Sequence, residues 1–136
     1  MVAIEIVYQG QLHCQALHTP SGATLETDAP KDNNGKGESF SPTDLVATAL
    51  GSCMLTVMGI AARTLNIDLT GTTVKVNKEM VATPVRRIGK LTVNLTFPMQ
   101  ISDENKKKLE HAALTCPVHK SLHPDVAMPI EFNWAN

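Results

Sequence analysis

The longest apolar stretch of the chain, Leu45–Ala62, contains no charged residue. The residues just before it carry the signals of a helix start. Ser41 is a preferred capping residue, Pro42 suits the first helical position, and Asp44, three residues after the cap, completes a capping box. The pattern therefore predicts one long helix over Ser41–Asn66.

Both faces of this predicted helix are apolar. At about 100° per residue, the side that holds Cys53 is lined by larger aliphatic residues, namely Leu45, Val46, Ala49, Leu50, Val57, Ile60 and Ala61. The opposite side includes Gly51 and Gly59, which weaken a helix by roughly 1 kcal/mol each relative to alanine. Such glycines are easier to explain where another backbone comes close, so we expect close packing on both sides.

A transmembrane span is an alternative interpretation of the same stretch, because its length approaches that of a membrane-crossing helix. No Trp or Tyr flanks the stretch, although these residues are typical of the lipid interface. The neighbouring segments have the pattern of a soluble chain. We therefore expect a helix that is buried on all sides in a soluble protein and packed at a dimer interface.

Strand patterns surround the helix on both sides. Before it, alternation over Ala3–Tyr8, Gln11–His18 and Ala23–Thr27 predicts a small antiparallel meander with a turn at Gln9-Gly10. The following segment, Asp28–Phe40, is rich in Gly, Asn, Asp and Lys, so we expect an exposed loop.

After the helix, the pattern predicts two strands, two helical segments and a last strand. The strands are expected over Thr72–Met80 and Lys90–Phe97, a capped helix over Ser102–Thr115, a short helical turn from Pro117 to Leu122, and a strand over Val126–Trp134. This order indicates an α+β fold in a single domain over residues 1–136. Two chains that share their long helices would cover both sheets.

Composition and charge narrow the classes of partner and compartment. Twelve basic and thirteen acidic residues nearly cancel, so no overall field favours nucleic acid or an anionic membrane. The first residues, MVAIEIVYQG, lack the features of a secretory signal, and we expect a cytoplasmic protein. In that reducing compartment the three cysteines are better explained as free thiols than as a disulfide framework.

The candidate functional cysteines are Cys53, in the long helix, and Cys116, directly before Pro117. Position alone favours buried, inert thiols, since free cysteine is among the most buried residue types. A metal site is a second possibility, because the intervals between Cys116, His119 and His123 suit ligands. That set lacks a fourth ligand, so the spacing leaves both interpretations open.

Two segments of the chain resemble the OsmC/Ohr family of thiol-dependent hydroperoxide reductases. They are SPTDLVATALGSCM, from Ser41 to Met54, with its spacing of Pro, Leu and Cys, and TCPVHKSL, from Thr115 to Leu122. The resemblance implies an OsmC-like fold in which antiparallel sheets wrap two long central helices of an intertwined homodimer. It also implies that Cys53 is the peroxidatic cysteine and Cys116 the resolving one.

The chemistry implied by this resemblance needs no bound cofactor and no metal. A Cys53 thiolate would attack an organic hydroperoxide and become a sulfenic acid, which Cys116 would convert to a disulfide. An external dithiol protein would then reduce the disulfide. The role would be oxidative-stress defence, with no nucleic acid or membrane as partner.

The chain departs from the family pattern around the thiolate. Thr43 stands where the reductases carry a glutamate. Their thiolate-stabilising arginine comes from the N-terminal half and has no match here, since the arginines are Arg63, at the end of the long helix, Arg86 and Arg87. An apolar wall raises a thiol pKa, so a cation or hydrogen-bond donor is needed near Cys53. Glu38 and His119 are the substitutes that the sequence offers.

These departures keep two other functions open. One is a non-peroxidatic OsmC-like protein that binds a small hydrophobic ligand at the dimer interface. The other is a thiol redox sensor. If the protein is a peroxidase, the missing partners lead us to expect a slow one.

Overall fold

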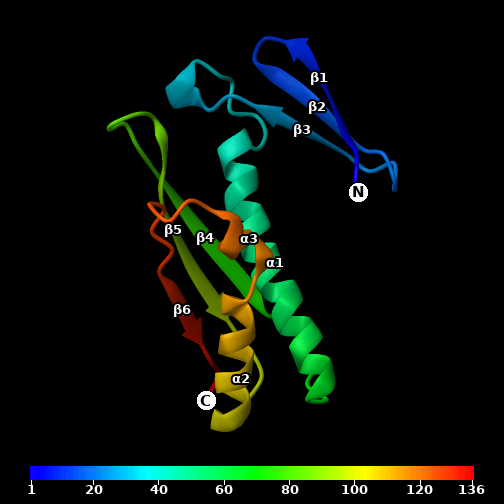
Figure 1. Cartoon of the computed structure of the whole chain (residues 1–136), viewed down its shortest axis with the longest axis vertical. Helices are drawn as coiled ribbons and strands as arrows, with labels where there is room; N and C mark the ends of the chain where they lie inside the picture. The colour runs from blue at the N-terminus through cyan, green and yellow to red at the C-terminus, as the bar shows by residue number, and fades with distance from the viewer. The chain divides into compact units, whose positions relative to one another are not determined.

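The computed structural model describes all 136 residues and divides into two compact units, Met1–Val46 and Ala47–Asn136. Figure 1 shows the order of their elements. Each unit is described by itself below. The prediction of a single domain over residues 1–136 stays a prediction.

The first unit contains a three-stranded antiparallel sheet in the order β1-β2-β3. Its strands are β1 (Ile4–Gly10), β2 (His13–His18) and β3 (Thr24–Asp28). The predicted meander is therefore confirmed. Its first turn lies later than expected, because Gly10, Gln11 and Leu12 all have positive φ, as a tight hairpin turn requires.

The segment after β3 differs from the expected exposed loop at one end. A short 3₁₀ helix, η1 (Lys31–Asn33), lies in the otherwise exposed segment. The sequence pattern places Asp28 in the loop, but in the structure Asp28 ends β3 and is only 5 % exposed. Its backbone N–H donates to the Phe40 carbonyl at 3.0 Å, and its carboxylate accepts from the Glu38 N–H at 3.1 Å. These bonds bring both ends of the loop together and bury Asp28.

The start of the long helix α1 (Pro42–Thr64) is confirmed in detail. The Asp44 N–H donates to Ser41 Oγ at 3.0 Å, while the Ser41 N–H donates to Asp44 Oδ2 at 2.9 Å. This is the reciprocal arrangement of a capping box, which satisfies two otherwise unpaired backbone donors.

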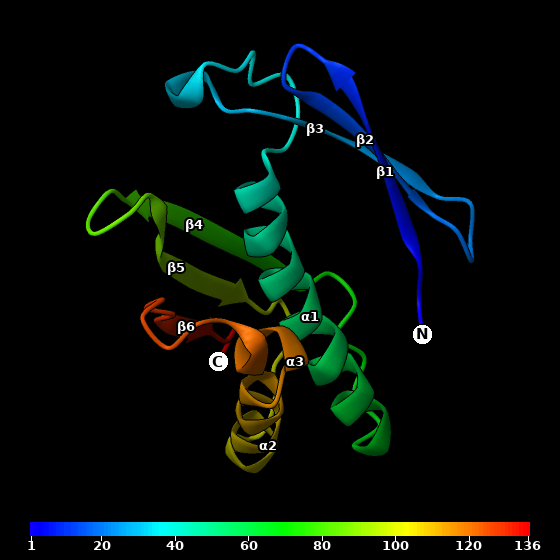
Figure 2. The same cartoon turned by 45° about the horizontal axis from the view of Figure 1, so that its top comes forward.

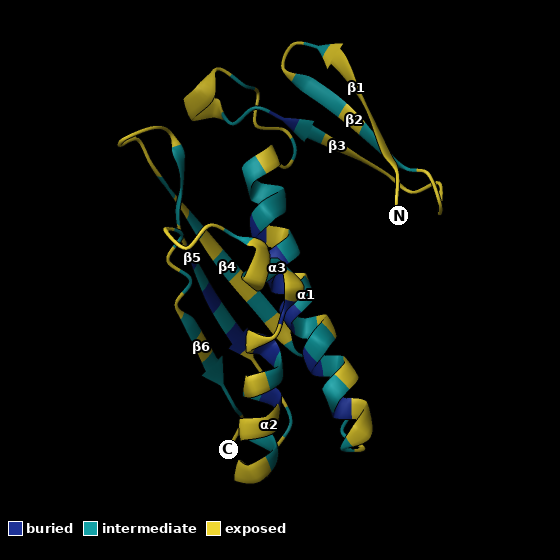
Figure 3. Ribbon diagram, viewed as in Figure 1, coloured by how far each residue is buried: buried dark blue, intermediate teal, exposed yellow.

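The burial of α1 differs from the expectation that the helix is buried on all sides. Within one chain it buries a single stripe, namely Ala47, Leu50, Gly51, Met54, Met58 and Ala62, and Figure 3 shows exposed positions on its remaining surface. Ile60, for example, is 60 % exposed. One chain packs its second unit against only one side of α1, so apolar residues on the rest of the helix stay unburied.

The two helix glycines also behave differently from each other. A Cβ on Gly51 would lie 3.0 Å from Cγ2 of Val76, so the backbone of α1 does come close to β4 (Thr73–Val81). At Gly59 no neighbouring atom lies within 4 Å of such a Cβ. The expected close packing is therefore found at Gly51 and not, within one chain, at Gly59.

By length and composition, α1 is able to cross a membrane, with a mean hydropathy of 1.9 over its most apolar window. Core helices of soluble proteins meet the same criterion. Within one chain, 33 % of that window is buried.

The second sheet has the order β4-β5-β6, with β5 at Arg87–Thr96 and β6 at Ile130–Asn133. The pair β4–β5 is antiparallel, as expected, but β5–β6 is parallel. The chain leaves β5 through α2 (Asp103–Leu114) and α3 (Pro117–Ser121) before it returns, and such a crossover allows parallel pairing. The last strand is also shorter than predicted, with only an isolated bridge from Lys90 to Ala127 before it.

The core of the second unit lies between this sheet and the helices. Alternate residues of β5 are fully buried, and they meet the buried stripe of α1 and the buried residues of α2; the largest members are Phe97, Leu50, Met54, Met58, Leu91, Leu95 and Leu109. Phe97 stacks on Trp134 with ring centroids 3.8 Å apart. Figures 1 and 2 both show α3 beside the middle of α1. The predicted α+β fold class is thus confirmed.

Candidate active site

The structure places Cys53 and Cys116 on different elements of the second unit. Cys53 lies in the middle of α1, next to the fully buried Met54, and is itself partly exposed. Cys116 is fully buried and caps α3. Pro117 stops α2 from continuing, because proline has no N–H to donate, and the chain turns at Cys116 into α3.

The two side chains lie near each other, because Cys53 is among the groups that shift the pKa of the Cys116 thiol. The Cys116 sulfur accepts the backbone N–H of His119 in the following turn, at 3.4 Å. Both cysteines are free thiols. The fold therefore brings together two cysteines that lie far apart in the sequence.

Burial is the main cause of the shifted pKa of the Cys116 thiol. It raises the pKa of the Cys116 thiol above the ordinary value, and the neighbouring Cys53 side chain raises it further. The backbone N–H groups of His119 and Val118 lower the pKa and only partly offset this rise. No cation is among the groups that shift it, so Cys116 is a neutral thiol at neutral pH.

Of the other site candidates from the sequence, His119 belongs to the second unit and Glu38 to the first. His119 contacts Cys116 through its backbone, while its ring Nδ1 is buried without a hydrogen-bond partner. Glu38 is exposed and lies in the first unit, where its N–H binds Asp28. Thr43 lies in the first turn of α1, where its hydroxyl is 3.1 Å from that of Ser41.

The structure does not bring together the side chains that a metal site would need. No group of three or more His, Cys, Asp or Glu side chains is placed to hold an ion. His123 is exposed, and its Nδ1 accepts the Asp125 N–H at 3.0 Å. The ligand-like intervals in the sequence therefore do not bring Cys116, His119 and His123 together.

Sequence reasoning missed a lysine on the inner side of the second sheet. Lys78 is partly buried and shares its face of β4 with Val74, Val76 and Met80, which are also partly buried. Strict alternation along the strand carries the signal, because successive side chains point to opposite faces. A cation therefore lies on a face that is otherwise apolar.

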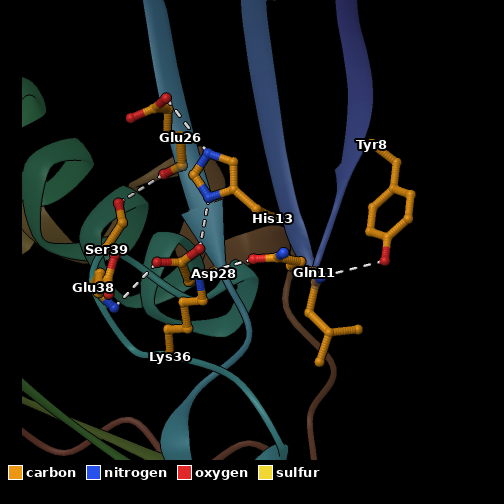
Figure 4. A network of polar contacts seen from close by, with 9 residues as sticks. Tyr8, Gln11, His13, Glu26, Asp28, Lys36, Glu38 and Ser39 are labelled. Carbon is orange, nitrogen blue, oxygen red and sulfur yellow. Dashed lines mark hydrogen bonds and ion pairs between the residues drawn. The ribbon is translucent and has the colours of Figure 1, made fainter.

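A polar cluster in the first unit was also missed (Figure 4). His13 Nδ1 donates to Asp28 Oδ1 at 2.6 Å, and Nε2 lies 3.4 Å from Glu26 Oε1. Beside it, Lys36 Nζ donates to Gln11 Oε1 at 2.9 Å. A cavity of about 410 Å³ adjoins this cluster; its lining is Gln9, Gly10, Gln11, His13, Asp28, Lys36 and Glu38.

The charged forms of His13 and Asp28 stabilise each other in this cluster. The hydrogen bond with Asp28 is the main reason that the pKa of His13 is raised, and the same bond is the main reason that the pKa of Asp28 is lowered. Both carboxylate oxygens of Asp28 and both ring nitrogens of His13 already have partners within the unit. We therefore regard the cluster as a clamp that joins β2, β3 and the loop.

Comparison with known proteins places the chain in a family. The family model described as OsmC-like protein matches residues 35–131. No curated protein matches the chain.

Solved structures agree over nearly the full length. A protein from Psychrobacter arcticus 273-4, whose name proposes a role in osmotic stress induced and detoxification response, is 47 % identical, with a TM-score of 0.93 over 98 % of this chain and 96 % of that one. An organic hydroperoxide resistance protein OsmC from Legionella pneumophila is 16 % identical (TM-score 0.79, 98 % and 96 %). An organic hydroperoxide resistance protein from Elizabethkingia anophelis is also 16 % identical (TM-score 0.71, 98 % and 95 %).

The latter two, at their low identity, support the fold alone. The family match covers most of the chain, and it includes Cys53, Cys116 and the segment between them. The chain therefore belongs to the OsmC-like protein family.

Proposed function

We propose that the protein is a thiol-dependent peroxidase that reduces organic hydroperoxides with Cys53 and Cys116, in oxidative-stress defence. The observation that carries the proposal is that the fold brings the free thiols of Cys53 and Cys116 near enough for Cys53 to shift the pKa of Cys116. Neighbouring thiols on two elements can form a disulfide when their geometry allows it. The names of two related structures, which concern organic hydroperoxide resistance, agree with this activity.

The reaction follows from the exposure of each thiol. Cys53 is the accessible member, so its thiolate attacks the terminal oxygen of the hydroperoxide. The O–O bond breaks, Cys53 becomes a sulfenic acid, and the alkoxide takes a proton to leave as an alcohol. The Cys116 thiolate then attacks the Cys53 sulfur, which forms the disulfide and releases hydroxide, and hydroxide takes a proton to become water.

The surroundings of Cys53 support an organic substrate. Ala49 and Val57, one turn before and one turn after it on α1, are apolar and, like Cys53, only partly buried. Apolar contacts favour the hydrocarbon part of an organic hydroperoxide, which H₂O₂ lacks. The proposed cycle uses no bound cofactor, and an external dithiol protein reduces the disulfide. It suits the cytoplasm, where thiols are kept reduced.

A homodimer is part of the same proposal. The helix α1 is strongly apolar, yet one chain buries only one stripe of it and leaves Ile60 60 % exposed. A second copy that packs on α1 would remove this apolar surface from water. No nucleic acid or membrane is included among the partners.

Peroxide titration of the reduced protein tests the activity. We expect one equivalent of cumene hydroperoxide to consume two thiols, and peptide mapping to find Cys53 linked to Cys116, with H₂O₂ reacting more slowly. The Cys14→Ser variant is the matched control and should react like the parent. Two thiols that survive an excess of cumene hydroperoxide would overturn the proposal.

A ligand-binding function is the second candidate. It is favoured by the departures from the family pattern, because Thr43 stands where the reductases carry a glutamate and the arginines are Arg63, Arg86 and Arg87. Under this alternative the thiols stay reduced in the titration, and a hydrophobic dye bound to the protein is displaced by the ligand. The peroxidase should therefore lose two thiols in the titration, whereas the ligand-binding protein should keep both.

A further inference from the structure

The cavity of about 410 Å³ in the first unit differs in character from an apolar ligand pocket. Its volume lies within the range of about 300–1,000 Å³ that is usual for small-molecule sites. Apart from Gly10, every residue that lines it has a polar side chain, and no cysteine is among them. The cavity therefore suits a small polar molecule, and its occupant does not depend on the proposed peroxidase activity.

Hydrogen bonds between the β1–β2 hairpin, β3 and the loop after β3 fix the walls of the cavity. His13 Nδ1 donates to Asp28 Oδ1 at 2.6 Å, and Asp28 Oδ2 accepts the Glu38 N–H at 3.1 Å (Figure 4). A further bond joins the Ala29 N–H to the Leu12 carbonyl at 3.1 Å. A site whose walls are already held in place loses less conformational freedom when a ligand binds.

Lys36 and Gln11 form the donor side of the cavity. Lys36 Nζ donates to Gln11 Oε1 at 2.9 Å. An ammonium group has three N–H donors, so two remain on Lys36, and the bond leaves the NH₂ group of Gln11 as a further donor. Hydrogen bonds between an ammonium group and a carboxylate are stronger than those between neutral groups. This side of the cavity therefore suits a carboxylate.

Glu38 supplies the acceptor side. Its backbone N–H is bonded to Asp28, whereas its carboxylate has no hydrogen bond or ion pair within the protein. The charged forms of His13 and Asp28 pair with each other, so neither adds an uncompensated charge to the lining. The charges that remain in the lining are the Lys36 ammonium and the Glu38 carboxylate, one of each sign.

We propose that this cavity binds a small zwitterion, a free amino acid or a short peptide, whose carboxylate contacts Lys36 and Gln11 and whose ammonium group contacts Glu38. A molecule with only one of these charges leaves the opposite charge of the cavity without a partner. An apolar molecule would remove polar groups from water without replacing their hydrogen bonds. A metal ion is a poorer occupant, because no group of three or more suitable side chains is gathered there.

Titration of the parent protein tests the proposal without any variant. L-Alanine and L-alanyl-L-alanine are each added to the ¹⁵N-labelled chain at constant pH and ionic strength, and NMR follows the side-chain NH₂ signals of Gln9 and Gln11. We expect these signals to shift and to reach saturation. Propionate and propylamine each carry only one of the two charges, so they should bind at least about tenfold more weakly.

Variants of the two charged residues then locate the binding. Lys36→Gln and Glu38→Gln each remove one charge of the cavity and should weaken binding of the zwitterion about tenfold. Both residues are exposed, so the variants should keep the fold. Lys31→Gln and Glu5→Gln are matched controls, because they remove the same charges at exposed positions outside the cavity, and they should bind like the parent.

Three results would each overturn the inference. One is the lack of a saturable shift with both L-alanine and L-alanyl-L-alanine. Another is binding of propionate or propylamine that is as strong as that of the zwitterions. The third is unchanged binding by both Lys36→Gln and Glu38→Gln. Titration of the same samples with cumene hydroperoxide reports on the peroxidase function separately, because no cysteine lines the cavity.

Discussion

The His13–Asp28 pair of the first unit and the Cys53–Cys116 pair of the second unit each join a partly exposed side chain to a buried one. Asp28 is 5 % exposed and Cys116 is fully buried. Yet the pKa of Asp28 is lowered, whereas the pKa of Cys116 is raised. Asp28 accepts hydrogen bonds from a basic ring and a backbone N–H, but Cys116 faces another thiol. The partner, rather than burial alone, decides which buried group is charged.

Among the changes that test this comparison of the two pairs, loss of the accessible Cys53 thiol should have the largest effect. Cys53→Ser removes the nucleophile, so we expect hydroperoxide consumption to be abolished. Cys116→Ser should permit one turnover and then stop at the sulfenic or over-oxidised state. Consumption by each variant is measured with a ferrous-xylenol orange assay. Full activity of Cys53→Ser would show that the chemistry lies elsewhere.

Packing beneath α1 should have the next largest effect. A Cβ at Gly51 would lie 3.0 Å from Val76, so Gly51→Val should destabilise the protein by about 1–3 kcal/mol through overpacking. Gly59→Ala meets no atom within one chain and should stabilise it by up to about 1 kcal/mol. Urea unfolding measures both. Destabilisation by Gly59→Ala together with weaker self-association would indicate that a second copy packs there.

The neutral state of Cys116 predicts how disulfide formation depends on pH. Because its pKa lies above the ordinary value of 9.0, the Cys116 thiolate fraction should rise about tenfold per pH unit between pH 6 and 8. The rate at which the Cys53 sulfenic acid is resolved should rise in proportion. Single-turnover trapping of the sulfenic acid with dimedone measures this rate. A rate that is independent of pH in this range would contradict a neutral Cys116.

The charged clamp should respond to pH in the opposite way and with the smallest effect. Its raised His13 pKa contributes stability that is fully present below the ordinary value of 6.5 and is lost as pH rises through the folded value. The lowered Asp28 pKa contributes stability that is present above 3.8 and is lost as pH falls through the folded value.

His13→Gln is the variant that tests this pH window. Its melting temperature should fall furthest below that of the parent between pH 4 and 6.5, and the gap should narrow towards pH 9. Thermal unfolding by circular dichroism measures the gap, with His18→Gln as the matched control on the same strand. A gap of constant size across this range would mean that the charge of His13 is unimportant.

The features that were predicted correctly depend on residues close together in the sequence. Ser41 and Asp44 are three residues apart, so their capping box can be read locally, and the same holds for the alternation along β4. The contact of Cys53 with Cys116 joins distant segments, and only the family resemblance pointed to it. Spacing alone left both thiols as inert core residues.

The features that were missed depend on the fold. Asp28 stands at the start of a polar segment, and its contacts with His13 on the neighbouring strand and with Glu38 and Phe40 bury it. The parallel pairing of β6 depends on the path that α2 and α3 take, which no local pattern fixes. Gly51 and Gly59 look alike in the sequence, and only the position of Val76 distinguishes them.

The parallel pairing of β5 with β6 has a consequence for the order of folding. It joins Val93 to Ile130 across the crossover that contains Cys116, so this pairing closes a longer loop than the β4–β5 hairpin does. Longer loops lose more chain entropy on closure, and contacts between distant residues form late. We therefore expect the Cys116 thiol to remain reactive in a chain whose β4–β5 hairpin has already formed, and to become protected only when the last strand docks.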